Sequence, residues 1–199
     1  KLDNVRIQYL ANNNSNGYAS GIDLKINGEF VPGVESWASL SIMQTKEDIE
    51  GDSYVDENGN TIYPGYIPRP TDQRVNFSMF FQDYIPRNPN YKMHMSFIYG
   101  TGLPFGPPKA EKYQDVLRIP AYRRVDIGFS AVLKNENKRS KIKWLNVLNS
   151  MWISAEVLNL LNINNTVSYL WVSDVSGRQY AVPNYLTPRQ VNFKLTINI

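Results

Sequence analysis

The feature that most constrains the fold is an unbroken alternation of apolar and polar side chains over residues 190–199. Val191, Phe193, Leu195, Ile197 and Ile199 are apolar, and polar residues stand between them. A period of two predicts a β-strand with one apolar and one polar face. Such a strand fits a soluble sheet half-covered by a core, or a membrane barrel with lipid outside and water inside. Its length favours the second setting, since tilted membrane strands need about 9–11 residues, whereas soluble strands usually have about 5–6.

The same alternation recurs along the chain and predicts about eight strands in total. The further segments are residues 4–9, 21–27, 37–43, 74–82, 91–99, 124–133 and 151–158. Residues 12–17 are expected to form a loop, and 45–72 a long polar connection. The pattern therefore predicts an all-β fold of antiparallel transmembrane barrel strands.

The connections between these strands alternate in length. If residue 199 lies on the periplasmic side, then 28–33, 83–90 and 134–150 are inner connections, whereas 45–72, 100–121 and 159–189 are outer ones. Short periplasmic turns and long extracellular loops are typical of outer-membrane barrels. The inner connection 134–150 is longer than that rule expects.

Aromatic residues gather at the predicted strand ends, where amphipathic rings favour the membrane–water interface. They are Phe81, Tyr84, Tyr91, Tyr99, Tyr122, Trp144 and Trp152. We interpret them as interfacial girdles. On each predicted strand the apolar side chains should face lipid and the polar ones the lumen. The lipid-facing set includes Phe77, Met93, Met95, Ile127, Phe129, Leu195 and Ile197, and the lumen-facing set includes Lys92, His94, Asp126, Ser130, Asn192 and Lys194.

Composition excludes several other classes of protein. A hydrophobic content of 42% with 13% aromatic residues argues against a disordered chain, and no apolar run approaches the roughly 18 residues of a membrane helix. The net charge of +3 is dispersed, so no nucleic-acid partner is expected. Cysteine is absent, which excludes disulfides and thiolate metal sites. Because the sequence starts at Lys1 without a signal peptide, we expect a processed chain or a piece of a longer protein.

Three motifs resemble those of TonB-dependent outer-membrane receptors. Residues 122–129 (YRRVDIGF) resemble a late strand of these receptors, 152–162 (WISAEVLNLLN) their penultimate strand, and 187–190 (TPRQ) the entry to their last strand. Residues 166–171 (TVSYLW) resemble the Bacteroidetes branch, whose members often carry a carboxypeptidase-regulatory-like N-terminal domain. The resemblance covers most of the chain and is strongest from Gln73 onward.

The resemblance implies that residues 1–199 are the C-terminal segment of a larger receptor barrel, with no second domain. It implies a barrel of about 22 strands and an outer membrane of a Gram-negative bacterium as the location. The implied partners are outer-membrane lipid, the rest of the barrel with its plug domain, TonB through an N-terminal part, and a surface lipoprotein. Family members are much longer than this chain, and Ile199 stands where many such barrels end in an aromatic residue.

Catalytic, cofactor and metal sites are not expected. His94 is the only histidine and stands on a polar strand face without a nucleophile motif. The acidic residues of 47–57 could hold a hard cation through oxygen atoms, but the glycine of 56–60 (DENGN) does not fit the order of an EF-hand. We interpret this segment as a hairpin turning at Asn58-Gly59, and predict a similar one at Ser176-Gly177.

The two predicted hairpins carry exposed aromatic residues and an arginine, which could stack on a sugar, a peptide or a chelate. The candidate substrate-binding residues are Tyr54, Tyr63, Tyr66, Trp171, Arg178 and Tyr180. On the lumen face, Asp126 and Glu156 are expected to contact a plug or to line a solvated wall.

The expected function is TonB-dependent active transport of a nutrient, such as a glycan, a peptide or a metal chelate, rather than an enzymatic activity. Two alternatives remain at this point. The chain could be a small standalone outer-membrane barrel with a structural or adhesive role, in which case the strand at residues 5–9 would pair with 191–199. It could also be a secreted β-sandwich that binds carbohydrate.

Overall fold

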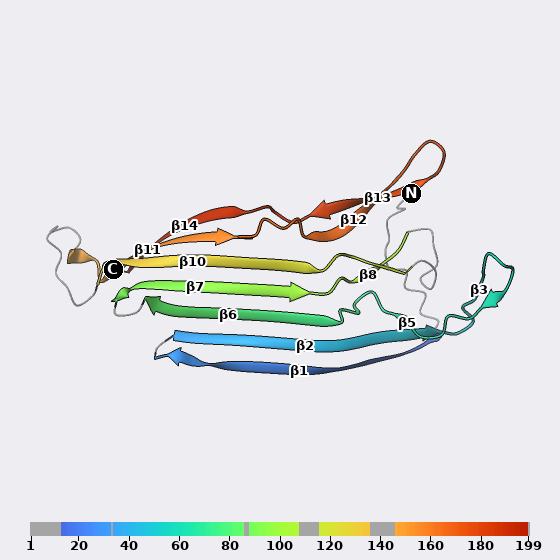
Figure 1. The fold of residues 1–199 in the computed structure, drawn as a ribbon, viewed down its shortest axis with the longest axis horizontal. Coiled ribbons are helices and arrows are strands. Elements are labelled where there is room, and N and C mark those ends of the chain that lie inside the picture. Colours follow the sequence, from blue (N-terminus) through green and yellow to red (C-terminus); the bar gives the residue numbers. More distant parts are fainter. Residues whose placement is uncertain (1–12, 33, 86–87, 108–115, 136–145, 199) are drawn as a thin grey trace.

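A computed structural model describes residues 13–32, 34–85, 88–107, 116–135 and 146–198. These residues form an all-β structure built on one antiparallel sheet (Figure 1). Seven long strands follow one another in the order β1-β2-β6-β7-β10-β11-β14. Their bounds are β1 Ser15–Val31, β2 Val34–Ile49, β6 Val75–Ile85, β7 Asn88–Gly100, β10 Tyr122–Lys134, β11 Ser150–Leu158 and β14 Gln190–Asn198.

Shorter strands lie at one end of the sheet. β5 (Ile67–Pro68) pairs with β2 at Lys46 and Glu47. Three separate hairpins pair only within themselves: β3 (Tyr54–Val55) with β4 (Thr61–Ile62), β8 (Pro104–Phe105) with β9 (Leu117–Arg118), and β12 (Thr166–Ser173) with β13 (Gln179–Tyr185). No helix in the described part of the chain is long and apolar enough to span a membrane.

The predicted all-β, antiparallel fold is confirmed, and strands occur at every predicted position that the structure describes. The predicted strand around residues 4–9 lies outside the described residues. A closed barrel is not observed, because among the described strands β1 pairs only with β2 and β14 only with β11.

The first hairpin is longer than predicted. The expected loop at 12–17 was wrong from Ser15 onward, and the expected connection at 45–72 was wrong up to Ile49, since both segments belong to strands. The ladder continues from Ile22 opposite Ile42 to Ser15 opposite Ile49. Gly and Ser weaken the side-chain pattern here, but the backbone hydrogen bonds of a pre-formed hairpin continue regardless of side chain.

The connections join the strands at the predicted ends of the sheet, but two inner ones were predicted too long: residues 28–31 belong to β1, and 83–85 and 88–90 belong to β6 and β7. Residues 32–33, 86–87 and 135–149 join strands at the end where β14 finishes, and 50–74, 101–121 and 159–189 join them at the other end. Figure 1 shows β3, β8, β12 and β13 gathered at this second end, which is called the far end below.

Register divides the sheet into two faces. Residues directly opposite each other lie on the same face, and one row runs through Ile26, Ala38, Met79, Phe97 and Val125. The other face includes a polar row of Gln82, His94, Gly128, Glu156 and Asn192. The predicted division of side chains between the two faces is therefore confirmed, whereas the medium that each face contacts stays a prediction.

The apolar face has no cover. Val34 and Ile67 are the only buried hydrophobic residues in the described part of the chain. Ile26 is 70% exposed and Phe193 is 74% exposed, although both lie on the apolar face. A single sheet layer cannot bury its own side chains, so these residues require a second layer or an apolar medium.

The same register tests the predicted girdles. Phe81, Tyr91 and Tyr99 lie on the apolar face, where a lipid-facing girdle requires them. Tyr84, Tyr122 and Trp152 lie opposite Lys92, Gly100 and Thr196 respectively, on the polar face. These three residues therefore share the face of the polar row and do not fit a girdle on the apolar face, while the girdle itself stays a prediction. Trp144 lies outside the described residues.

Candidate functional site

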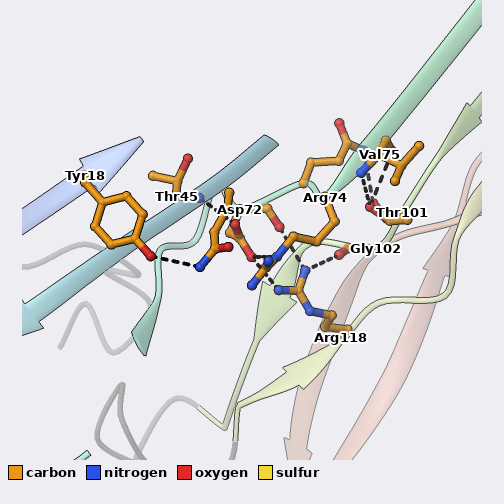
Figure 2. Close-up of polar contacts among 10 residues, drawn as sticks. Tyr18, Thr45, Asp72, Arg74, Val75, Thr101, Gly102 and Arg118 are labelled. Atoms are coloured by element: carbon orange, nitrogen blue, oxygen red, sulfur yellow. Dashed lines mark hydrogen bonds and ion pairs between the residues drawn. The ribbon is translucent and has the colours of Figure 1, made fainter. Parts of the chain in front are cut away.

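A buried carboxylate organises the far end of the sheet. Asp72 precedes β6 and has no exposed surface. Its Oδ1 accepts a hydrogen bond from the Thr45 backbone N–H at 2.7 Å. Its Oδ2 accepts from Arg74 Nε at 2.8 Å and from Arg118 Nη2 at 2.5 Å. One side chain therefore joins β2, the β5–β6 connection and β9 (Figure 2).

Arg118 makes further contacts with backbone carbonyls. Its Nη1 donates to the Asp72 carbonyl at 2.9 Å and to the Gly102 carbonyl at 3.0 Å. Gly102 is required because a Cβ atom there would lie 1.4 Å from the Ile119 carbonyl oxygen. We name Thr45, Asp72, Arg74, Gly102 and Arg118 the polar clasp.

The charge state of the clasp follows from its hydrogen bonds. Burial would raise the pKa of Asp72, but hydrogen bonds from Thr45, Arg118 and Arg74 outweigh burial and hold that pKa below its ordinary value. Asp72 is therefore a carboxylate at neutral pH and pairs with two guanidinium groups. A fixed charge of this kind suits a structural joint better than an acid–base catalyst, whose pKa lies near the working pH.

A second polar cluster anchors the β12–β13 hairpin. Asn165, buried, accepts the Arg123 N–H and donates to the Arg123 carbonyl, both at 2.8 Å. Its own carbonyl accepts the Leu186 N–H at 2.9 Å. One end of the hairpin thus binds to the start of β10 through Asn165, and the other end binds to Asn165.

Asp126 extends this anchor toward the polar face. Its Oδ1 accepts from the Asn159 N–H at 2.8 Å and from Arg124 Nε at 2.7 Å, and Ser96 Oγ donates to Oδ2 at 3.3 Å. Asn159 is buried and has a positive φ of 53°, which asparagine tolerates better than most residues. The predicted plug-contacting residue Asp126 is thus bonded within its own sheet.

The candidate substrate-binding residues fall into two separate groups. Tyr54, Tyr63 and Tyr66 lie on or beside the β3–β4 hairpin, and Trp171, Arg178 and Tyr180 on the β12–β13 hairpin. Figure 1 places the two hairpins at opposite edges of the far end. The structure therefore does not bring the six residues together, and their role in binding stays a prediction.

Several of these aromatic residues contact other parts of the chain. Tyr66 meets the Tyr18 ring edge to face at 5.4 Å. Phe105 of β8 stacks on Tyr169 at 4.5 Å between ring centroids and lies 6.3 Å from Trp171. Of the five aromatic residues among the six, Tyr63 is the most open, at 76% exposed.

Both predicted hairpins are confirmed, but each loop has one residue more than the predicted two-residue turn. Asp56 Oδ1 accepts the Asn58 and Asn60 N–H groups, and Asp174 Oδ1 accepts those of Ser176 and Arg178. Gly59 and Gly177 follow at φ of 83° and 81°. Each loop is a turn closed by a left-handed glycine rather than a two-residue turn.

The two loop carboxylates are kept ionised by their hydrogen bonds. Hydrogen bonds, from Asn60 above all, lower the pKa of Asp56. Those from Ser176 likewise lower the pKa of Asp174. These carboxylates therefore serve the turns.

His94 takes part in a polar contact on the middle of the sheet. Its Nε2 lies 3.5 Å from Glu156 Oε1, and Asn192 Nδ2 donates to Glu156 Oε2 at 3.2 Å. Gly128 lies on β10, between His94 of β7 and Glu156 of β11. A Cβ atom at Gly128 would lie 2.3 Å from His94 Cε1. Over the described ranges, no three His, Asp or Glu side chains are grouped closely enough to hold a metal ion.

Comparison with known proteins identified no relative. No family model matches the sequence. No curated protein matches it either. No solved structure matches the fold. The likeness to TonB-dependent receptors therefore rests on the residues quoted above.

Sequence reasoning did not find the polar clasp or Asn165. Asp72 and Arg118 are 46 positions apart, so no local motif contains both. The available signal was weaker: Asp72 lies two residues before the alternating segment 74–82, and an acceptor near a strand end can bind backbone N–H groups that have no ladder partner.

Proposed function

We propose that this chain supplies barrel strands and outer connections to an outer-membrane transporter of the TonB-dependent receptor type. The transported nutrient is a glycan, a peptide or a metal chelate. The observation that carries the proposal is the uncovered apolar face, which crosses all seven long strands and is backed by a polar face. This combination suits lipid on one side and a wet or protein-filled lumen on the other.

Leaving one Leu, Ile or Phe side chain in water rather than in an apolar environment costs about 1.5–3 kcal/mol. Ile22, Leu24, Ile26, Phe129 and Phe193 are each at least half exposed. The cost for these five residues alone is of the same order as the 5–15 kcal/mol by which proteins are typically stable. Lipid removes this cost without requiring a second protein layer.

The secreted β-sandwich alternative is disfavoured by the same observation. A sandwich needs a second sheet packed about 10 Å from the first. The described residues form one large sheet and three two-stranded hairpins, none of which covers the apolar strands.

The medium at each face can be measured with single-cysteine variants, since the sequence contains no cysteine. A fluorophore at Ile127 or Leu195 should be quenched by brominated lipid. The matched control positions, Ser130 and Lys194, lie on the opposite face of the same strands and should not be quenched. Equal quenching of both pairs, or reaction of the first pair with a water-soluble maleimide in intact membranes, would overturn the membrane assignment.

Placing a charge on the same face provides an independent measurement. Ile127→Arg should cost about 2–4 kcal/mol if this position lies near the bilayer midplane. The matched change Ser130→Arg, on the polar face of β10, should cost much less. Unfolding free energies in lipid or detergent would show the difference, and equal costs would contradict the assignment of faces.

Transport requires its own experiment. A strain lacking the gene should be screened for growth on glycans, peptides and metal chelates as limiting nutrients. The growth defect should match that of a strain lacking TonB on the same nutrient. If the strain lacking the gene shows a growth defect but the strain lacking TonB grows normally on the same nutrient, the standalone structural barrel would be favoured instead.

A further inference from the structure

The far-end connections are joined to one another by two contacts of different chemistry. The polar clasp holds the base of the β8–β9 hairpin to the β5–β6 connection through Arg118 and Asp72. The ring of Phe105, on β8, stacks on Tyr169 of β12. The β8–β9 hairpin thus lies between the β5–β6 connection on one side and the β12–β13 hairpin on the other.

The base of the β8–β9 hairpin is also closed within itself. The Ile119 N–H donates to the Leu103 carbonyl at 3.0 Å, and the Thr101 N–H donates to the Val75 carbonyl at 2.9 Å. Gln73 Nε2 donates to the Thr101 carbonyl at 3.1 Å. These bonds leave little freedom for Phe105 to move independently of Arg118.

We propose that Arg118 is a positioning residue that couples the β5–β6 connection to the β12–β13 hairpin, so that the far end responds to a ligand as one unit. A displacement at the β5–β6 connection or at the β12–β13 hairpin is passed to the other through Asp72, Arg118, the base of the β8–β9 hairpin and the Phe105–Tyr169 stack. This inference rests on the contacts of the far end alone and holds whether or not the apolar face contacts lipid.

The chemistry of Arg118 explains why this residue is suited to the task. Its guanidinium group presents donors in a fixed planar fork, so one side chain bridges the Asp72 carboxylate, the Asp72 carbonyl and the Gly102 carbonyl at the same time. A lysine carries the same charge but lacks the fork. The Arg118→Lys variant therefore separates the charge from the bridging geometry.

The test is amide hydrogen exchange on the intact chain in its native membrane or detergent. In Arg118→Gln, exchange should accelerate about tenfold or more at Ile119 and Thr45, next to the clasp. It should also accelerate at Leu170 and Val172 on the β12–β13 hairpin, which the clasp does not touch. Arg118→Lys should show an intermediate effect at both places.

Coupling between two sites is reciprocal, so the opposite perturbation completes the test. Phe105→Ala should accelerate exchange at Thr45, although Phe105 lies on β8 and pairs with Leu117 rather than with Thr45 or Asp72. Arg69→Gln is the matched control, since Arg69 lies in the same β5–β6 connection, forms a 3.5 Å ion pair with Glu47 of β2 and is 52% exposed. Acceleration confined to residues next to each substitution would overturn the coupling. Unchanged exchange in the strand interior, at Ile127 and Phe129, shows that the variants remain folded.

Discussion

At the scale of single residues, this protein depends on polar side chains more than on an apolar core. Buried polar groups cost free energy unless they are hydrogen-bonded, and Asp72, Asn159 and Asn165 each receive or donate several such bonds. Each of these side chains replaces a backbone partner where a strand ends or a connection departs. Substituting them should therefore affect the connections more than the sheet.

Asp72 is expected to be the most sensitive of these positions. Asp72→Asn keeps the size but leaves Arg74 and Arg118 without their carboxylate, so the free energy of unfolding should fall by about 3 kcal/mol. Denaturant titration measures this loss. Arg69→Gln should change stability by less than about 1 kcal/mol, since that pair is exposed. Equal effects of the two substitutions would show that the clasp carries no special stability.

The pH dependence of the same residue has a definite sign. The folded-state pKa of Asp72 is lowered, so the carboxylate binds its proton less tightly in the folded than in the unfolded chain. Its contribution to stability should be complete above the unfolded value, about pH 3.9, and should be lost as the pH falls through the folded-state pKa. Unfolding measured from pH 6 to pH 2 should show an acid loss that Asp72→Asn lacks; an identical acid loss in that variant would contradict this assignment.

Gly128 is the residue whose replacement is expected to disturb the polar face. Gly128→Ala brings a methyl group within 2.3 Å of His94 Cε1, so we expect a loss of about 1–3 kcal/mol from overpacking. The double variant Gly128→Ala/His94→Ala should recover most of that loss relative to His94→Ala alone. The same loss in both backgrounds would mean that the backbone, rather than His94, requires the glycine.

At the scale of elements, the hairpins of the far end are separable from the sheet. Within the described ranges, β12 pairs only with β13, and the hairpin binds the sheet through Asn165 at its base. If the chain acts as the proposed transporter, replacing residues 168–184 by a short glycine linker that keeps Asn165 should leave a folded protein in the membrane with reduced uptake of its nutrient. Loss of membrane insertion in this deletion would show that the hairpin is needed for folding.

The elements were predictable from sequence to the extent that side chains alternate. Val75, Phe77, Met79 and Phe81 identify β6 because each apolar position contributes to one face. The start of β1 was missed because Ser15, Asn16 and Gly17 carry no such signal, yet their backbone groups pair with β2. The clasp was missed because Arg118 and Asp72 meet only after the strands between them have paired.

At the scale of the whole molecule, the two outer strands each leave one edge unpaired within the described chain. In hydrocarbon every unpaired backbone group costs several kcal/mol, so we expect β14 to pair along both edges in the membrane. All amides from Val191 to Asn198 should then be protected from hydrogen exchange. Protection limited to the alternate amides that face β11 would show an open edge and would contradict a barrel.

The order of the strands in the sheet has a consequence for how the chain folds. Among the described residues, each long strand pairs with the next long strand in the sequence, from β1 to β14. Contacts between neighbouring segments are formed faster than distant ones, and isolated hairpins close in about 1–10 μs. The tight β1–β2 and β6–β7 hairpins can therefore nucleate independently and accept later strands one at a time. The slowest steps should be the closures of the far-end connections, because these join one nucleus to the next.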